Sequence, residues 1–493
     1  MLLEHYEAGL PAARPHLTKW AQIFTDSLGF LLANWLGFWF AEGVRYAAAW
    51  PVLRAHPSMM LRLAVWGLWV FALVAWFWLV RGHYTQRRPF WDETRDVCIA
   101  LLVAAVGEAA LLFVIQAPFS RLWWLTTWLA ALPILLLGRA LLRRVLTHLG
   151  WWQRPILIFG AGENGQEAFA ALKSERWLGY HVLAFVVPCV DAPEAENLGI
   201  STLMGKPVIS YVLDSPARPF LARLNQPAVL IALEPQQLDI QQLLVQRFSV
   251  AGADINIAPP LKGLPLYGTE LTHFFSHEVL LLRVQNNLSR RASRFIKRTF
   301  DLCVSSVLIV GLLPVWIGLF IAARRDGGPA TYCAPRLGRN GVDFPCYKFR
   351  SMVLDADTCL REHLAAHPEV QPEWERFRKL KDDPRVTRFG AFARRTSLDE
   401  LPQLFNVFKG DMSLVGPRPI LHDEIERFGE DWAFYLMARP GITGLWQISG
   451  RNDVDFASRV ALDSWYVRNW SLWYDIVILI KTVKVVLARE GAY

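Results

Sequence analysis

The sequence lacks paired cysteines and is poor in charge. Its six cysteines form no Cys-x-x-Cys pair, which argues against a disulfide framework or a zinc site. Charged residues make up 19% of the chain and hydrophobic ones 53%, whereas soluble domains are about 25% charged. A basic start followed by a long apolar core is also missing, so we expect no signal peptide. These features exclude a disordered chain and disfavour a purely soluble enzyme.

The charge that is present is basic in balance. The net charge is +8, and residues 290–493 contribute most of it, with 30 Lys and Arg against 24 Asp and Glu. An apolar and basic chain favours an anionic membrane surface or an anionic substrate as partner. Nucleic acid is disfavoured, because the basic residues lie in Pro/Gly-rich loops and beside apolar segments rather than among stacking aromatics.

Four apolar segments in the first third predict membrane helices. Each has about 20 residues, the length that crosses ~30 Å of hydrocarbon; they are 22–44, 60–80, 97–116 and 122–142. More Arg residues follow the second and fourth segments than the first and third, which predicts that both ends of this bundle face the cytosol. We interpret Glu108, inside the third segment, as a group that faces the bundle interior.

A strand, a glycine-rich turn and a helix follow the last apolar segment. The apolar run 156–159 leads into Gly160, Gly162 and Gly165, which form G-x-G-x-x-G. Further strands alternate with helices and predict a doubly wound sheet; they are 182–187, 208–212 and 228–233. A dinucleotide site also needs an acid at the end of the second strand, where Val186-Val187-Pro188-Cys189 stands, with Asp191 only beyond. We therefore favour a Rossmann-like domain that keeps its glycines for packing or regulation.

A later apolar stretch predicts a broken membrane helix. Residues 302–323 are long enough to span, yet arginines and lysines flank both ends. Pro314 lies in the middle, where it removes a backbone hydrogen bond. We expect a hairpin that enters the membrane and returns, and a plain fifth crossing is the alternative. Residues 463–487 read as one amphipathic helix, with aromatics for the headgroup region or, alternatively, for the core.

The candidate chemistry centres on Asp399 and Glu400. These adjacent acids precede Pro402 and an apolar helix, which places them at a helix N-terminus. A capping box between Ser397 and Glu400 is the structural alternative. Basic residues surround the pair in rigid Pro/Gly-rich or polar loops that suit phosphate oxygens; they are Lys348, Arg350, Arg394, Arg418, Arg439 and Arg451. Because Mg²⁺ uses one or two carboxylates plus substrate phosphates, we expect a Mg²⁺–diphosphate site held by Asp399 and Glu400.

Three motifs around these residues resemble the bacterial sugar transferase family, the monotopic phosphoglycosyl transferases. They are KFRSM from Lys348, TSLDELPQLFNVFKGDMSLVGPRP from Thr396, and RPGITGLWQISGRN from Arg439. The whole chain resembles the large subclass. The resemblance implies transfer of hexose 1-phosphate from a UDP-sugar to undecaprenyl phosphate with release of UMP, the first membrane step of O-antigen, capsule or exopolysaccharide synthesis. It favours UDP-galactose, with glucose or an N-acetylated sugar as alternatives.

The resemblance also implies roles for single residues. Asp399 is the implied nucleophile, and Glu400 assists through the metal or as acid/base. Further matches to positions that the family uses at its site are Lys348, Arg394, Arg418, Arg451 and Asp463. The family has Ser-Pro at the break of the hairpin, whereas this chain has Leu313-Pro314.

The expected fold is that of an α/β membrane protein with three parts. These are a four-helix transmembrane bundle (1–150), a Rossmann-like doubly wound domain (151–275) and a mainly helical catalytic domain (276–493) with a re-entrant helix hairpin at about 296–325. We expect a homodimer among membrane lipids in the bacterial inner membrane, with the site on the cytosolic face. An NAD-dependent nucleotide-sugar enzyme is a weaker hypothesis, because no Tyr-x-x-x-Lys pair is present, and a non-enzymatic scaffold leaves Asp399 and Glu400 unexplained.

Overall fold

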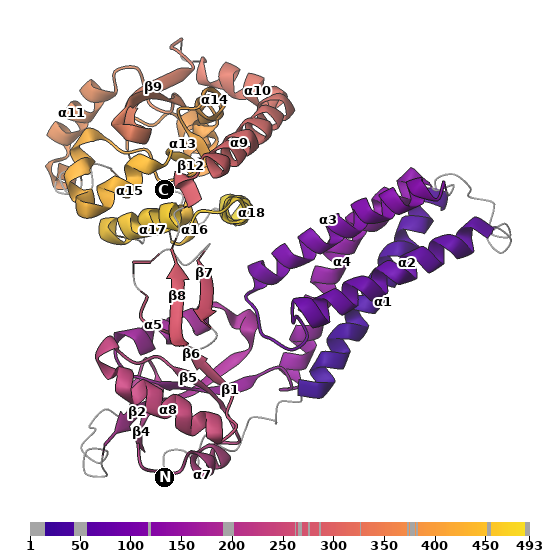
Figure 1. The fold of residues 1–493 in the computed structure, drawn as a ribbon. Helices are drawn as coiled ribbons and strands as arrows, with labels where there is room; N and C mark the ends of the chain where they lie inside the picture. The colour runs from indigo at the N-terminus through magenta and orange to yellow at the C-terminus, as the bar shows by residue number, and fades with distance from the viewer. Residues whose placement is uncertain are drawn as a thin grey trace. The chain divides into compact units, whose positions relative to one another are not determined.

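A computed structural model describes most of the chain. The described residues are 15–43, 57–116, 120–190, 202–261, 263–264, 269–274, 277–284, 287–325, 327–371, 374, 380, 383–450 and 455–488. The chain divides into two compact units, Met1–Leu261 and Lys262–Tyr493 (Figure 1). The predicted boundaries of the three parts stay a prediction.

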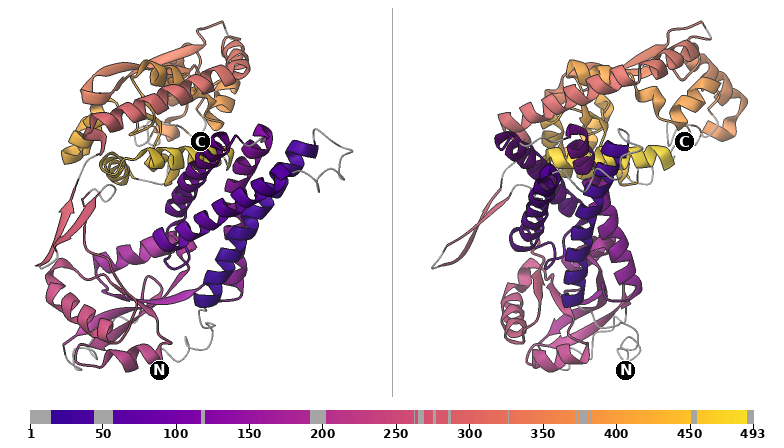
Figure 2. Two further views of the ribbon diagram at one scale, coloured as in Figure 1. Left: turned by 45° about the vertical axis from the view of Figure 1, so that its right-hand side comes forward. Right: turned by 90° about the vertical axis from the view of Figure 1, so that its right-hand side faces the viewer.

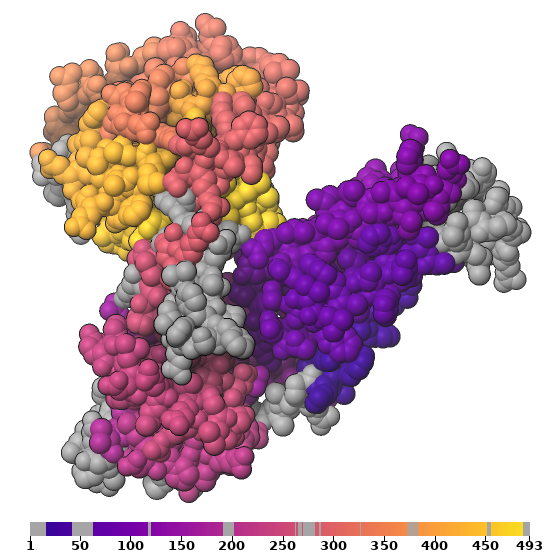
Figure 3. Space-filling model, in the orientation of Figure 1, coloured from indigo at the N-terminus to yellow at the C-terminus, as the bar shows by residue number. Residues whose placement is uncertain are grey.

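The first unit begins with a bundle of long helices that forms one elongated body (Figure 3). The helices are α1 (Pro15–Gly43), α2 (Pro57–Ala75) with the π-helical turn η2 (Trp76–Val80), α3 (Phe90–Val114) and α4 (Arg121–His148). Helices α1 and α4 pack closely, since a Cβ on Gly37 would lie 2.2 Å from the Thr127 hydroxyl oxygen. Large apolar side chains such as Phe71 and Phe113 are exposed on the outside of the bundle.

Four helices of the described residues are long and apolar enough to cross a membrane. They overlap the four predicted segments, so the expected apolar helices are present, and their crossing of a membrane stays a prediction. Glu108 is buried and accepts a 2.7 Å hydrogen bond from the Trp128 indole, as expected for a group that faces the interior. The outside is therefore apolar, while the inside carries the polar groups, which is the arrangement that a lipid environment stabilises.

A six-stranded sheet completes the first unit. Its order is β3-β4-β2-β1-β5-β6, and all neighbours are parallel except β3 and β4. The strands are β1 (Arg154–Phe159), β2 (Tyr180–Cys189), β3 (Thr202–Leu203), β4 (Lys206–Val212), β5 (Ala228–Ile231) and β6 (Ile255–Ile257). Helix α5 (Glu163–Ser174) packs on one face, and α7 (Ala217–Arg223) and α8 (Leu238–Val250) pack on the other. The predicted doubly wound sheet is thus present.

The three glycines of the G-x-G-x-x-G motif are explained by contacts inside the chain. A Cβ on Gly160 would meet the Ala232 carbonyl oxygen at 2.2 Å, and one on Gly165 would meet the Gly160 carbonyl oxygen at 2.1 Å. Gly162 faces the carboxylate of Glu234, which lies 2.4 Å from the Cβ position and accepts a 2.9 Å hydrogen bond from the Asn164 backbone N–H. In dinucleotide-binding domains this helix N-terminus holds a phosphate. Here a carboxylate of the chain lies there, which supports the packing interpretation.

We expect the purified protein to carry no nicotinamide cofactor. The Glu234 carboxylate repels a pyrophosphate and occupies its place beside Gly162. Nicotinamide fluorescence of the purified protein, with and without added NADH, measures this directly. Energy transfer from tryptophan to stoichiometrically bound NADH in the wild-type chain would contradict the packing interpretation; a Glu234→Gln variant shows whether the carboxylate charge is what excludes the cofactor.

The second unit is built mainly of short helices. Its helices are α9 (Arg291–Gly311), α10 (Leu313–Ala323), α11 (Ala356–Ala366), α13 (Arg388–Arg395), α14 (Gln403–Lys409), α15 (Trp432–Met437), α16 (Leu445–Ile448), α17 (Phe456–Arg468) and α18 (Leu472–Ala488). Its strands form three two-stranded sheets, which are β7 (Glu270–Phe274) with β8 (His277–Arg283), β9 (Thr331–Leu337) with β10 (Asp343–Phe349), and β11 (Ser413–Val415) with β12 (Gly441–Thr443). The β7–β8 ribbon projects from this unit as an arm (Figure 2).

Helices α9 and α10 form a bent pair. Their axes differ by 67° at a break around Leu312, and Pro314 lies in the first turn of α10. There its missing N–H costs nothing, because the first turn has no intrahelical partner for it. The predicted break at Pro314 therefore has the expected local geometry.

Residues 463–487 form two helices, so the prediction of one long amphipathic helix is wrong. The chain breaks between α17 and α18, where the Ser471 hydroxyl accepts a 3.1 Å hydrogen bond from the Tyr474 N–H. Tyr466 and Trp470 are buried in the core of the unit instead of lying at an interface. For Tyr466 and Trp470, the alternative prediction that these aromatics pack in the core is therefore the correct one.

Candidate active site

Asp399 and Glu400 lie in a short 3₁₀ turn, Leu398–Glu400, between α13 and α14. Pro402 occupies the N-cap of α14, so the two acids lie just before this helix rather than in its first turn. Ser397 has a left-handed backbone with φ 55° and caps nothing with its side chain. The capping-box alternative is therefore wrong, and no capping bond between Ser397 and Glu400 occupies their side chains.

The turn is anchored by the leucines that flank the acids. Leu398 and Leu401 pack against Leu319 and Ala323 of α10 and against Phe349 at the end of β10. The acids are thus held at the end of the bent α9–α10 pair. This packing fixes the position of the two carboxylates relative to the α9–α10 pair.

Two of the predicted basic residues join the acids. The Lys348 amino group, on β10, lies 2.7 Å from a Glu400 carboxylate oxygen. Arg394, at the end of α13, is close enough to lower the pKa of Asp399 and donates a 3.0 Å hydrogen bond to the Ser351 hydroxyl. We call Lys348, Arg394, Asp399 and Glu400 the acid–base group.

The environment of Asp399 favours its protonated form more than water does. Burial and the neighbouring Glu400 carboxylate raise its pKa to about 6, against the opposing effect of Lys348 and Arg394. A carboxyl group with a pKa near 6 is largely ionised at neutral pH, and in this partly desolvated place it is a better nucleophile than a solvated carboxylate.

Arg418 and Asp463 belong to a second group. The Arg418 backbone N–H donates to the Asp463 carboxylate at 3.4 Å, and Arg459 pairs with Glu424 at 3.3 Å next to them. Burial raises the pKa of Asp463 to about 7 although Arg418 and Arg459 oppose it. The sequence interpretation missed Glu424 and Arg459, because neither lies in a motif with proline or glycine.

The remaining predicted residues lie elsewhere. The Arg350 guanidinium donates a 2.9 Å hydrogen bond to the Ala323 carbonyl at the end of α10, so it helps to hold the bent pair. Arg439 is partly buried, and burial together with Arg298 and Arg339 lowers its pKa. Arg451 falls outside the described residues, as does Asp191.

Helix α9 carries two basic residues that the sequence interpretation assigned only to a membrane flank, Lys297 and Arg298, and an acid that it did not assign, Asp301. Arg298 donates to the Val407 and Phe408 carbonyls at 2.6 and 2.8 Å, which satisfies the C-terminal end of α14. Lys297 donates to the Val415 carbonyl at 3.0 Å, and the Asp301 carboxylate accepts from the Leu414 N–H at 3.1 Å. These bonds tie the segment that follows the acids to the bent pair.

Comparisons with known proteins identify the relatives of this chain. A sequence profile described as "Bacterial sugar transferase" matches residues 292–489, and one described as "CoA-binding domain" matches residues 79–259. The undecaprenyl-phosphate galactose phosphotransferase of Salmonella typhimurium is 45% identical over 97% of this chain and 98% of its own length. The chain belongs to the bacterial sugar transferase family. It is therefore an enzyme, a phosphoglycosyl transferase, as the motifs indicated.

Two further relatives cover different shares of the chain. The UDP-galactose-lipid carrier transferase of Erwinia amylovora is 43% identical over 85% of this chain. The exopolysaccharide production protein ExoY of Sinorhizobium fredii is 48% identical over 40% of this chain but over 88% of its own length. ExoY thus matches less than half of this chain, although most of its own length is covered.

Proposed function

We propose that this enzyme transfers a hexose 1-phosphate, from UDP-galactose, to undecaprenyl phosphate and releases UMP. The observation that carries the proposal is the acid–base group: a nucleophilic carboxylate with a raised pKa, a second acid and two cations, held at the end of an apolar helix pair. The names of the full-length relatives from Salmonella and Erwinia support the donor and the lipid acceptor. The product supplies the first lipid-linked sugar of O-antigen, capsule or exopolysaccharide synthesis.

The reaction proceeds in two displacements in this proposal. The Asp399 carboxylate attacks the phosphorus that bears the sugar, the bond to the UMP oxygen breaks, and UMP leaves as a phosphate anion. The acceptor lipid phosphate then attacks the same phosphorus and releases the Asp399 carboxylate. Lys348 and Arg394 neutralise the phosphate oxygens as charge spreads over them. Arg350, Arg418, Arg439, Arg451 and Asp463 are proposed as the further donor-binding positions.

The residues present fit a Mg²⁺ ion that is shared with the substrate. No group of three or more His, Cys, Asp or Glu side chains among the described residues forms a complete protein cage. Mg²⁺ typically takes one or two carboxylates and completes its shell with substrate phosphates and water. Asp399 and Glu400 would hold it, and when bound it neutralises the diphosphate.

The proposal places the site at the cytosolic surface of the inner membrane. Helices α9 and α10 enter the membrane and return to the same side, with the break at Leu312 and Pro314. The four helices of the first unit cross the membrane. A hairpin that holds Leu398 and Leu401 at its end keeps Asp399 where a cytosolic UDP-sugar and a lipid phosphate can both reach it. We propose a homodimer as the functional state.

Release of UMP from a panel of UDP-sugars tests the function. We expect release from UDP-galactose, only with Mg²⁺, and formation of a lipid product when undecaprenyl phosphate is added. A higher rate with UDP-glucose or with UDP-N-acetylated sugars would change the proposed sugar but leave the proposed reaction in place. No UMP from any sugar in the presence of Mg²⁺ and lipid would refute the proposed function.

The pH dependence should report the ionisation of Asp399. Because the protonated acid cannot attack phosphorus, kcat/KM for the UDP-sugar should fall about tenfold per unit below pH 6 and level off above pH 7. Lys348→Gln removes a cation that lowers the pKa of Asp399, so the inflection should move to higher pH. Lys409→Gln, which removes an exposed lysine that bonds the Tyr347 hydroxyl, is the matched control and should leave the inflection in place. An inflection that Lys348→Gln does not move would contradict the assignment.

A further inference from the structure

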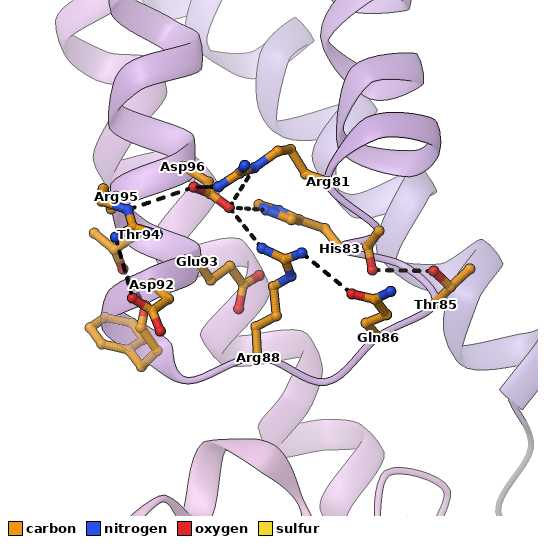
Figure 4. Close-up of polar contacts among 12 residues, drawn as sticks. Arg81, His83, Thr85, Gln86, Arg88, Asp92, Glu93, Thr94, Arg95 and Asp96 are labelled. Carbon is orange, nitrogen blue, oxygen red and sulfur yellow. Dashed lines mark hydrogen bonds and ion pairs between the residues drawn. The ribbon is translucent and has the colours of Figure 1, made fainter. Parts of the chain in front are cut away.

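A cluster of charged side chains lies at one end of the helix bundle in the first unit. It joins the segment between η2 and α3 to the first turns of α3, to α1 and to the last turns of α4 (Figure 4). We call it the junction cluster; its charged members are Asp26, Arg81, Arg87, Arg88, Glu93, Asp96, Arg139 and Arg143. With the neighbouring Arg95 and Asp92, it contains six guanidinium groups and four carboxylates, an excess of two positive charges.

Part of the cluster is balanced. Arg139 binds both oxygens of Asp26 at 2.9 and 2.6 Å and also Glu93 at 2.7 Å. Arg143 pairs with Glu93 at 2.7 Å. Two buried guanidinium groups thus share two buried carboxylates, and this set needs no further anion.

The other part has more cations than anions. Asp96 accepts from both Arg81 and Arg88, and His83 lies 3.3 Å away, as Figure 4 shows. Arg87 donates hydrogen bonds to the carbonyl oxygens of Trp152 at 2.7 Å and Leu178 at 2.5 Å, and it lies over the rings of Trp152 and Tyr180. Its pKa is lowered to about 10 by burial, with the nearby Arg154 and Arg143 adding to the effect against Tyr180 and Asp254. Asp96 therefore serves the guanidinium groups of Arg81, Arg88 and Arg95, while Arg87 bonds carbonyl oxygens.

A narrow pocket opens between these residues. It is lined by polar and charged side chains and by two tryptophans, namely His83, Gln86, Arg87, Arg88, Glu93, Arg143, Trp152 and Trp177. The Nε atom of Arg143 is buried beside it and has no hydrogen-bond partner among the described residues. Glu93 is already bound by Arg139 and Arg143, so it adds little repulsion for an incoming anion.

The pocket lies where apolar helices end. The span of α2 and η2 ends at Val80 and that of α3 begins at Phe90, so Gln86, Arg87 and Arg88 fall directly outside the apolar part. Lipid phosphates occupy that level, where Trp side chains are also favoured. Arg88 is partly exposed at the pocket, whereas Arg143 is buried.

We propose that this pocket binds the phosphate ester of a membrane lipid headgroup. Guanidinium forks from Arg87 and Arg88, together with the buried Nε of Arg143, are suited to phosphate oxygens, and one phosphate supplies negative charge that the cluster lacks. The pocket is narrow, so a phosphoryl oxygen enters it while the rest of the headgroup stays at the mouth beside Arg88. An anionic phospholipid and a polyprenyl phosphate share this chemistry, as does free phosphate. The first unit thereby gains a lipid-binding role that is separate from the acid–base group.

Hydrogen–deuterium exchange of the segment 81–96 in the purified full-length protein tests the proposal. Two matched pairs of lipids are compared, and in each pair only the first compound carries a phosphate. The pairs are phosphatidylglycerol with diacylglycerol, and undecaprenyl phosphate with undecaprenol. Inorganic phosphate is the fifth condition. We expect protection from a phosphate-bearing compound and none from its phosphate-free partner. Arg88→Gln should raise the concentration needed for half-maximal protection roughly tenfold or more, because it removes a charged hydrogen bond. Arg144→Gln removes an exposed arginine next to Arg143 on α4 and should change nothing.

Each outcome bears on the proposal. Protection by only one of the two phosphate-bearing lipids identifies that lipid as the source of the phosphate. Equal protection by inorganic phosphate identifies a soluble anion as the occupant of the same site. Equal protection by the phosphate-free lipids, retention of full protection in Arg88→Gln, or no protection in any condition would overturn it. Arg88→Lys, which keeps the charge but loses the fork, should give intermediate protection and covers the case in which Arg88→Gln does not fold.

Discussion

Asp399→Asn should abolish the release of UMP from UDP-sugar, with a loss on the order of 10⁴-fold or more in kcat. The amide keeps the size and most contacts of the side chain but is a poor nucleophile, so the first displacement fails. Because Lys348 and Arg394 remain, the UDP-sugar should still bind. Single-turnover UMP release and equilibrium binding of the UDP-sugar, measured on the same preparation, separate these two effects.

A matched control makes the result specific. Asp423→Asn changes an exposed acid at the start of another turn and should leave the rate within about twofold. Trapping of a radiolabelled phosphosugar on the wild-type chain, and its absence from Asp399→Asn, would identify the covalent step. Near-normal UMP release by Asp399→Asn would instead remove Asp399 as the nucleophile, while loss of UDP-sugar binding would point to a positioning role.

Local patterns in the sequence were enough to predict individual helices, strands and breaks. The four apolar segments, the strands around Gly160 and the break at Pro314 each depend on composition within about 20 neighbouring residues, and each was found. The position of Asp399 and Glu400 beside a helix also follows from Pro402. The pair of helices in 463–487 was missed, although Ser471 at the start of α18 was a usable capping signal.

Contacts between distant residues were beyond that kind of prediction. Arg139 and Asp26 are separated by 113 residues, and Arg298 and Val407 by 109, so no local pattern pairs them. The same holds for Glu234, which reaches the glycine turn from the end of β5. Of the basic residues predicted around the acids, Lys348 and Arg394 lie beside them. The Arg350 side chain instead turns to the end of α10, where it bonds a helix carbonyl. Side-chain direction depends on packing that a single sequence does not display.

Lys297→Met should lower the free energy of unfolding of the second unit by about 3–5 kcal/mol at pH 7.5, which is the cost of leaving a buried charge without its partner. Lys297 pairs with the buried Asp475 at 2.7 Å and also bonds the Val415 carbonyl. Burial raises the pKa of Asp475 even with Lys297, Tyr466 and Trp470 opposing it. Without the lysine, Asp475 must take up a proton on folding, which becomes harder as the pH rises.

The pH dependence and a double variant give the decisive comparison. Because the pKa of Asp475 in the folded variant lies above its unfolded value, Lys297→Met should be least stable at high pH and should regain stability as the pH falls toward 5. Lys297→Met with Asp475→Asn removes the buried charge. Tyr466 and Trp470 donate to different carboxylate oxygens of Asp475, so one of them can still donate to the amide oxygen, and much of the stability should return. Thermal unfolding of the single and double variants measures this. Lys484→Met, which changes an exposed lysine of α18, is the control. A single variant as stable as the wild type at pH 7.5 would show that the α9–α18 ion pair does not hold the bent helices to the catalytic core.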